Sequence, residues 1–185
     1  MENQTSLADS LSYGPPVTVD GPTPVSVTAD RLPDVEITTE RVEIVCSTGS
    51  SHTAAWTGPT VGSLLEAADA AAETTHLVVE STDEYRVVIP IREALGGVLA
   101  YLKDDVAIGA HNEYANRFVT PETDGARDIK GVATIEPVTL DPGEDPESLE
   151  NLFPEGERYT AHRVETDESG TETDDGESSQ KTSES

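Results

Sequence analysis

The chain has 185 residues, 37 acidic against 11 basic, which gives a formal net charge of −26, and 35% of its residues are hydrophobic. This length suits one folded domain with polar tails, since a chain of about 150 residues buries roughly 70% of its extended surface on folding. The negative charge repels phosphate backbones and anionic lipid, so we expect no nucleic acid and no membrane surface among its partners.

Charge and cysteine usage indicate a cytoplasmic protein adapted to high salt. Acidic residues occur throughout the chain, and concentrated salt screens their repulsion, because the Debye length is about 3 Å at 1 M. The N-terminus has no basic region followed by an apolar run, so we expect neither a secretion signal nor a membrane span. Cys46 is the sole cysteine, which excludes an internal disulfide and a cysteine-rich metal site.

Composition divides the chain into three parts. Residues 165–185 hold eight acids, one lysine and no apolar residue, and such a segment cannot bury enough surface to become ordered. We therefore expect a flexible N-terminus over residues 1–14, a folded body over 15–160 and an acidic disordered tail over 161–185.

The first predicted element of the body is a strand from Val35 to Cys46. Its apolar residues alternate, but the phase of the alternation changes after Thr39, which predicts a bulge or bend. The polar stretch from Ser47 to Thr57 is expected to be a loop. Apolar residues at helical spacing then predict a helix over residues 61–68, with Thr60 as its N-cap.

Short strands dominate the rest of the body. The expected strands span residues 77–80, 85–89, 98–102, 106–108, 117–119 and 129–138. The first and second of these strands are expected to form one hairpin, and the third and fourth another. Residues 91–95, between the two hairpins, allow one helical turn. Many short strands, one main helix and no repeating strand–helix pattern predict a mixed, strand-rich α+β fold.

Cys46 allows two interpretations. A lone cysteine in a cytoplasmic protein is usually a small buried hydrophobe. Its position at the end of a predicted strand, before a loop rich in hydroxyl groups, also suits a thiolate that a ligand can reach. The four histidines stand far apart in the sequence, so we expect no zinc site.

Arg117 and Lys130 flank a loop, and each lies next to a predicted strand end. In so acidic a chain, two cations held in this way make a fixed anion site, and the arginine fork can hold a phosphate with two hydrogen bonds. The alternative is a pair of surface charges matched to some of the many acids.

Several short motifs follow one another in a specific order along residues 17–140. They are the strand that ends at Cys46, the run Trp56-Thr57-Gly58, an amphipathic helix, the run Asp83-Glu84-Tyr85, and a longer run from Asn112 through Arg117, Pro121, Gly125 and Lys130 to Glu136. This order resembles the molybdopterin-binding domain of the sulfite oxidase family. Glu84 stands where that family has a glycine, and Ala115 where it has a proline.

The resemblance implies roles for five residues. Cys46 would be the protein thiolate on molybdenum, and soft thiolate donors suit such a metal. Arg117 and Lys130 would hold the phosphate of the pterin. Asn112 and Ser81 lie where the family makes further cofactor contacts.

The resemblance also implies a molybdenum-cofactor oxidoreductase that transfers an oxygen atom and two electrons on a small molecule such as an oxyanion or a sulfoxide. With no ligand set for haem, flavin or iron–sulfur clusters, such an enzyme is expected to use a separate redox partner. The alternative is a non-catalytic binding or interaction module of the same fold that has lost the cofactor. His52 and His111 are the acid–base candidates, against the ordinary alternative of surface histidines.

Overall fold

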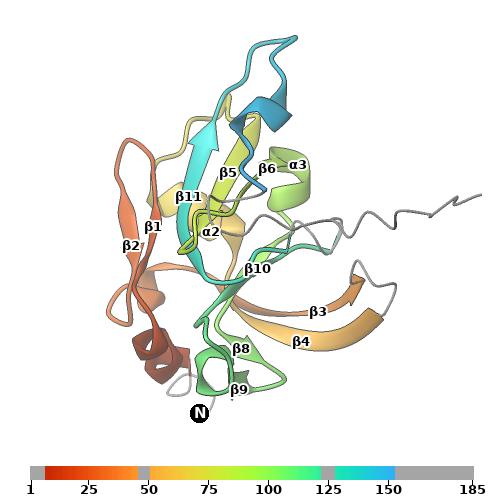
Figure 1. The fold of residues 1–185 in the computed structure, drawn as a ribbon. Helices are drawn as coiled ribbons and strands as arrows, with labels where there is room; N and C mark the ends of the chain where they lie inside the picture. The colour runs from red at the N-terminus through yellow and green to blue at the C-terminus, as the bar shows by residue number, and fades with distance from the viewer. Residues whose placement is uncertain (1–6, 46–50, 122–127, 153–185) are drawn as a thin grey trace, which may run out of the picture.

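Three sheets form the framework of the computed structural model, which describes residues 7–45, 51–121 and 128–152 (Figure 1). The largest contains, in spatial order, β2 (Val25–Val27), β1 (Val17–Val19), β11 (Val132–Val138), β5 (His76–Ser81) and β6 (Arg86–Pro90). The smallest pairs β10 (Arg117–Val119) with β7 (Val98–Ala100). The third contains β3 (Ile37–Val45), β4 (Ser51–Pro59), β8 (Leu102–Lys103) and β9 (Val106–Ala107).

Short helices connect the strands, and the mixed, strand-rich α+β class is confirmed. They include α2 (Val61–Ala67), α3 (Ile91–Ala94) and the 3-10 turns η1 (Leu11–Tyr13), η2 (Leu32–Asp34), η3 (Ile108–Ala110) and η4 (Pro146–Leu149). The predicted N-cap of α2 is confirmed, because the Thr60 hydroxyl accepts a hydrogen bond from the Ser63 N–H at 3.2 Å. No helix within the described ranges is long and apolar enough to cross a membrane.

Both predicted hairpins are present. β5 and β6 pair without interruption from His76 opposite Pro90 to Glu80 opposite Arg86. The second hairpin is β8–β9, with a two-residue turn in which Asp104 and Asp105 both have positive φ. Residues 98–102 are two strands rather than one, since β7 pairs with β10 and β8 pairs with β4.

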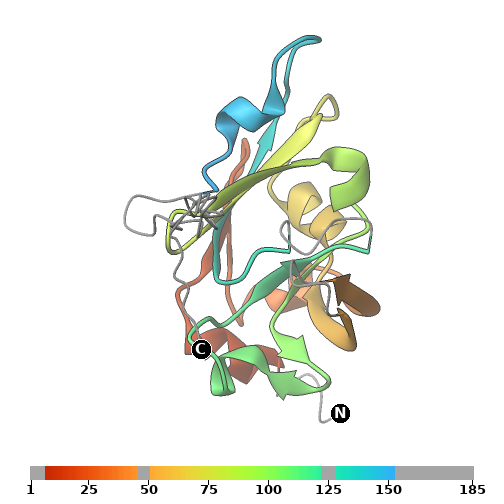
Figure 2. The same cartoon turned by 45° about the vertical axis from the view of Figure 1, so that its right-hand side comes forward.

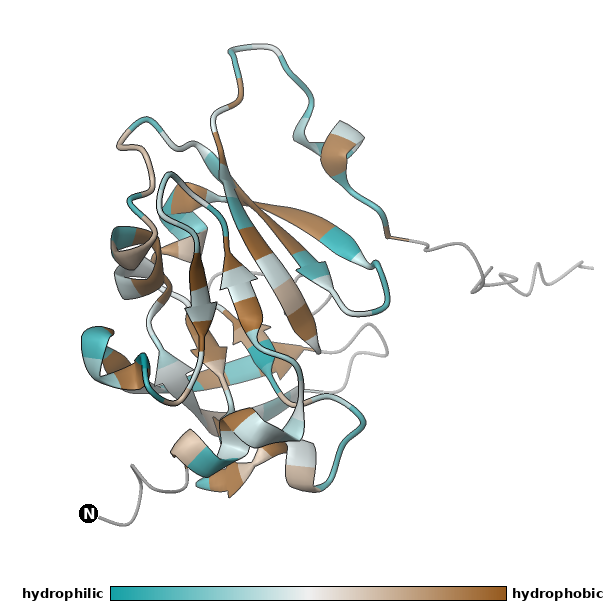
Figure 3. Cartoon of the chain, turned by 90° about the vertical axis from the view of Figure 1, so that its left-hand side faces the viewer, coloured by the Kyte–Doolittle hydropathy of each residue, from teal (hydrophilic) through white to brown (hydrophobic). Residues whose placement is uncertain are grey.

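The buried side chains form two clusters, and strand alternation distributes residues between them. The larger core lies against the large sheet and α2, and the apolar stretches of those strands are brown in Figure 3, with hydrophilic turns between them. The smaller core joins β3 and β4 to β7 and β10. Phe118 of β10 points into the larger core and Val119 into the smaller, so Arg117 shares the face of Val119.

The region around β3 and β4 corrects two sequence predictions. The bulge is wrong, because β3 pairs with β4 in one unbroken register from Ile37–Pro59 to Val45–Ser51. The expected loop over 47–57 is a strand from Ser51 onward. The phase change arises because the two ends of β3 face different surroundings: Ile37 lines a cavity, whereas Val42 and Ile44 are buried in the smaller core.

Both ends of the described chain pack onto the body. Leu7, inside the segment 1–14 that was expected to be flexible, is buried in the larger core. Residues 146–152, here called the C-terminal strap, lie at the opposite end of the molecule from the β8–β9 hairpin (Figure 2). The Arg86 and Asn151 main chains exchange two hydrogen bonds of 2.9 Å, and the Glu150 carboxylate accepts one from the Val88 N–H at 3.1 Å. The predicted tail, residues 161–185, lies outside the described residues.

Candidate functional site

Arg117 and Lys130 lie directly opposite each other. They form an isolated antiparallel bridge, so their side chains leave the backbone on the same face. The bridge is held by a hydrogen bond from the Phe118 N–H to the Ile129 carbonyl at 2.8 Å. The buried Asn116 side chain fixes the next residues, because it bonds both the N–H and the carbonyl of Val132.

The Arg117 side chain is buried and forms no ion pair with any described carboxylate. Arg117 is 7% exposed, and its Nε has no hydrogen-bond partner among the described residues. Other arginines of this acidic chain do find carboxylates, in the pairs Arg31–Asp34, Arg86–Glu80 and Arg92–Glu93. A buried cation that lacks a partner is destabilising, and an unsatisfied buried donor often marks a functional site. These two features make Arg117 a candidate anion-binding residue.

Two lysines extend this positive charge along the edge of the smaller core. Lys103 lies directly opposite Trp56 in the β8–β4 pairing, with its Nζ 5.5 Å from the indole centroid. The Arg117 guanidinium carbon lies 5.4 Å from the same centroid, and Lys130 Nζ lies 5.7 Å from the Tyr114 ring. We call Lys103, Arg117 and Lys130 the cationic rim.

His52 lies beside the cationic rim. It is on the same face of β4 as Trp56, and the two ring centroids are 6.3 Å apart. Partial burial lowers the pKa of His52, and Lys103, Arg117 and Lys130 lower that pKa further, while Asp104 opposes them. Nε2 of His52 is buried and has no hydrogen-bond partner in the described part of the chain. The imidazole is thus favoured in its neutral form, and the described residues leave its Nε2 unsatisfied.

The other predicted site residues are placed differently. Cys46 lies outside the described residues, directly after Val45, the last residue of β3. The Asn112 amide is partly used within its own turn, since it donates to the Ile108 carbonyl at 2.8 Å. His111 is exposed.

Ser81 organises the β5–β6 turn. Its hydroxyl bonds the Asp83 carboxylate and both the N–H and the carbonyl of Tyr85. This arrangement holds Glu84 at φ 66°, in the left-handed region that suits the glycine of the resembling family. The turn adjoins the site, because the Thr82 N–H donates to the Gly131 carbonyl at 2.8 Å.

Sequence reasoning did not assign roles to Trp56 and Lys103. Lys103 has the sequence signal of a hairpin turn, and Trp56 is one member of a motif. Their proximity depends on the register between β8 and β4, which no local pattern specifies. The one feature of the sequence that could have singled out Lys103 is that lysine is rare in this strongly acidic chain.

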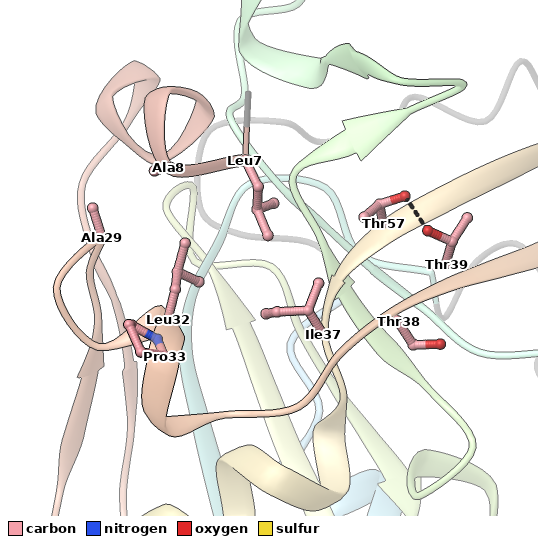
Figure 4. A pocket seen from close by; sticks show the side chains of 9 residues that line it. All are labelled: Leu7, Ala8, Ala29, Leu32, Pro33, Ile37, Thr38, Thr39 and Thr57. Atoms are coloured by element: carbon pink, nitrogen blue, oxygen red, sulfur yellow. Dashed lines mark hydrogen bonds between the residues drawn. The ribbon is translucent and has the colours of Figure 1, made fainter. Parts of the chain in front are cut away.

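A cavity lies on the other face of β4 from Trp56. Its volume is about 560 Å³, and Leu7, Leu32 and Ile37 form its apolar wall (Figure 4). The hydroxyls of Thr39 and Thr57 lie 2.8 Å apart in a hydrogen bond at its edge. Neither this cavity nor any other place in the described ranges gathers three or more metal-ligating His, Cys, Asp or Glu side chains.

The family of the chain follows from comparison with known proteins. The family model described as oxidoreductase molybdopterin binding domain matches residues 15–144. The chain belongs to this family. Its members bind the molybdopterin cofactor, whose phosphate needs cationic partners, and the unpaired Arg117 and the adjacent Lys130 fit that need.

A solved structure shares the fold of this molybdopterin-binding domain. It is the sulfane dehydrogenase SoxCD from Paracoccus pantotrophus, with a TM-score of 0.60 and 19% sequence identity. The match covers 68% of this chain but only 38% of the SoxCD chain. A comparison with curated proteins finds no match.

Proposed function

We propose that this protein binds the molybdopterin cofactor and catalyses two-electron oxygen-atom transfer on a small substrate such as an oxyanion or a sulfoxide. Arg117 and Lys130 hold the phosphate of the pterin, and Cys46 is the thiolate ligand of molybdenum. The proposal includes a separate redox partner and a cytoplasmic location.

The observation that carries the proposal is the arrangement of Arg117. Arg117, which is 7% exposed and whose Nε has no partner in the described part of the chain, stands beside a second cation in a chain of net charge −26. A bound phosphate would supply the missing acceptor and would balance both charges, and arginine and lysine are well suited to this task.

The chain's own groups would bind and orient the cofactor. When bound, the cofactor supplies the two-electron oxygen-atom transfer at its molybdenum. The bridge between Arg117 and Lys130 fixes the spacing of the two cations, and the two hydrogen bonds from Asn116 to Val132 hold the segment between Lys130 and β11 in place. Preorganisation of this kind reduces the entropy lost on binding.

The test is cofactor content after production in molybdate-supplied cells. Molybdenum is measured by mass spectrometry and pterin by fluorescence, in the wild type and in Arg117→Ala. Hydrogen bonds to charged groups contribute about 1.5–3 kcal/mol. The cofactor content of Arg117→Ala should therefore be lower than that of the wild type by a factor of about ten or more. Arg117→Lys should recover part of it, because one charge remains but the fork geometry is lost.

Arg92→Ala is the matched control. The Arg92 side chain is 83% exposed and pairs with Glu93, so its loss should leave molybdenum and pterin unchanged. Equal cofactor content in the wild type and in Arg117→Ala, or a wild type that takes up no molybdenum, would contradict the proposal and favour a non-catalytic module.

A further inference from the structure

Lys103 is a second cation without an acidic partner, on a different element from Arg117. It forms no ion pair with any described carboxylate, although Asp104 is its neighbour. The Asp104 side chain instead accepts a hydrogen bond from the Ala55 N–H at 2.9 Å, and the Asp104 N–H donates to the Ala55 carbonyl at 2.8 Å. The nearest acid in sequence is therefore committed to the backbone of β4.

His52 and this lysine lie against the same aromatic ring. The His52 and Trp56 ring centroids are 6.3 Å apart, and Lys103 Nζ lies 5.5 Å from the Trp56 centroid. The charge of Lys103 lowers the pKa of His52, in keeping with this placement. Both side chains are partly exposed, so a molecule from solution can reach them. The buried Nε2 of His52 still lacks a partner within the described chain.

Trp56 joins this pair to the Arg117–Lys130 pair. Its indole is 2% exposed, and its Nε1–H donor has no described acceptor. The ring contacts Lys103 from the neighbouring strand and Arg117 from the opposing sheet. Lys103, His52 and Arg117 thus all lie against the same indole ring.

We propose that Lys103 and His52 form a second anion-binding subsite, beside the Arg117–Lys130 pair and against Trp56, which takes a small oxyanion of the size of sulfate. The ammonium group supplies charge, and a neutral imidazole can donate a hydrogen bond from either ring nitrogen. The three positive charges of the rim would repel a cationic ligand. An apolar ligand would leave the imidazole without a hydrogen-bond partner. This subsite does not depend on the proposed function. If the proposed function holds, the anion bound here is the oxyanion substrate, and that step rests on the proposed function.

The test uses the full chain without cofactor and inorganic sulfate as the probe. Chloride is replaced by sulfate at constant ionic strength, because the net charge of −26 makes any anion binding sensitive to screening. Trp56 is the only tryptophan, so its indole N–H signal in NMR spectra reports on this place alone. We expect a saturable shift in the wild type, with a half-saturation concentration raised at least about tenfold in Lys103→Gln.

Arg41→Gln is the matched control. Arg41 is exposed on β3 opposite Ala55, so it lies on the face of the hairpin away from Trp56. Its half-saturation concentration should stay within about twofold of the wild type, and the response should persist in Arg117→Ala. Wild-type affinity in Lys103→Gln, loss of the response only in Arg117→Ala, or no response in the wild type would overturn the subsite.

Cofactor content separates this inference from the proposed function. Lys103→Gln should load molybdenum as the wild type does, because Lys103 is not one of the phosphate ligands. A protein that binds sulfate through Lys103 but never takes up molybdenum would support the subsite and refute the proposed function.

Discussion

The two faces of the β3–β4 hairpin differ in whether their polar side chains have hydrogen-bond partners. On the cavity face, the hydroxyls of Thr39 and Thr57 satisfy each other at 2.8 Å. On the face toward the cationic rim, His52 Nε2 and Trp56 Nε1 are buried and have no partner in the described part of the chain. Alternation along one strand, β4, separates the two conditions, since Trp56 and Thr57 are neighbours.

This difference distinguishes polar groups that stabilise the fold from polar groups whose hydrogen-bond partner would be a ligand. A buried polar group without a partner is destabilising by about 1–3 kcal/mol, and a structural face has no reason to keep several. Among the described residues, the rim face of the hairpin keeps two of them, on His52 and Trp56, and a third, on Arg117 of β10, lies against Trp56. We infer that the hairpin is structural on its cavity face and functional on its rim face.

The largest effect is expected where both faces are disturbed together, at Gly58. A methyl group there would lie 1.9 Å from the Leu99 carbonyl oxygen, because β4 and β7 pass close to each other at this point. Gly58→Ala should therefore lower the free energy of unfolding by about 3 kcal/mol, as measured in urea. Gly62→Ala is the control, since its methyl would meet only one atom, at 4.0 Å, and stability should be unchanged or higher. Equal effects of the two substitutions would show that the strands separate freely.

The next effect concerns Cys46 and sharpens the functional side of the comparison. If Cys46 is the metal ligand, Cys46→Ser replaces a soft thiolate by a hard hydroxyl of similar volume, so molybdenum should be lost while the melting temperature stays near that of the wild type. Metal analysis and circular dichroism in high salt measure the two quantities. A variant with full metal content would contradict the assignment. A fall in stability of roughly 1–3 kcal/mol without a metal signal would identify Cys46 as a core residue.

A smaller effect tests the structural side. Thr57→Val keeps the side-chain shape but leaves the Thr39 hydroxyl without its partner, so the free energy of unfolding should fall by about 1 kcal/mol. In the double variant Thr39→Val, Thr57→Val the loss should be smaller, because both polar groups are then absent. Urea unfolding completes the double-mutant cycle, and cofactor content should not change in any of the variants. Loss of cofactor from Thr57→Val alone would mean that the two faces are not separate.

The smallest effect is a pH dependence set by His52. Its pKa is lowered from the ordinary 6.5 by partial burial and then by the rim cations, so below about pH 6.5 the unfolded chain binds this proton more readily than the folded one. Stability should therefore fall as the pH drops from 6.5 through the lowered pKa of His52, and His52→Gln should reduce this slope. Thermal melting at fixed salt measures it, and identical slopes in the two proteins would show that the rim does not act on His52.

Local patterns predicted the elements whose boundaries depend on their own residues. The N-cap at Thr60, the β5–β6 hairpin and the strand Arg117–Val119 are confirmed. β4 was missed because Ser, His, Thr and Ala give no apolar alternation, and it becomes a strand by pairing with β3 along all nine residues. The roles of Lys103 and Trp56 likewise depend on cross-strand register.

The candidate site could be predicted in part. The rarity of cations in an acidic chain singled out Arg117 and Lys130, and the structure places them opposite each other. Sequence could not show that Arg117 is buried without a partner, because burial depends on how β10 packs against β4. The hydrogen bonds that the Ser81 and Asn112 side chains make within their own turns could not be predicted from local sequence patterns either.

The C-terminal strap has a consequence for solubility. β6 is the last strand on its side of the large sheet, and the strap covers its outer backbone groups at Arg86 and Val88. An uncovered strand edge is a template on which another molecule can add a strand. A chain shortened before Glu150 would expose that edge. In dilute salt the net charge would still keep such molecules apart. In concentrated salt this repulsion is screened, and the shortened chains would self-associate.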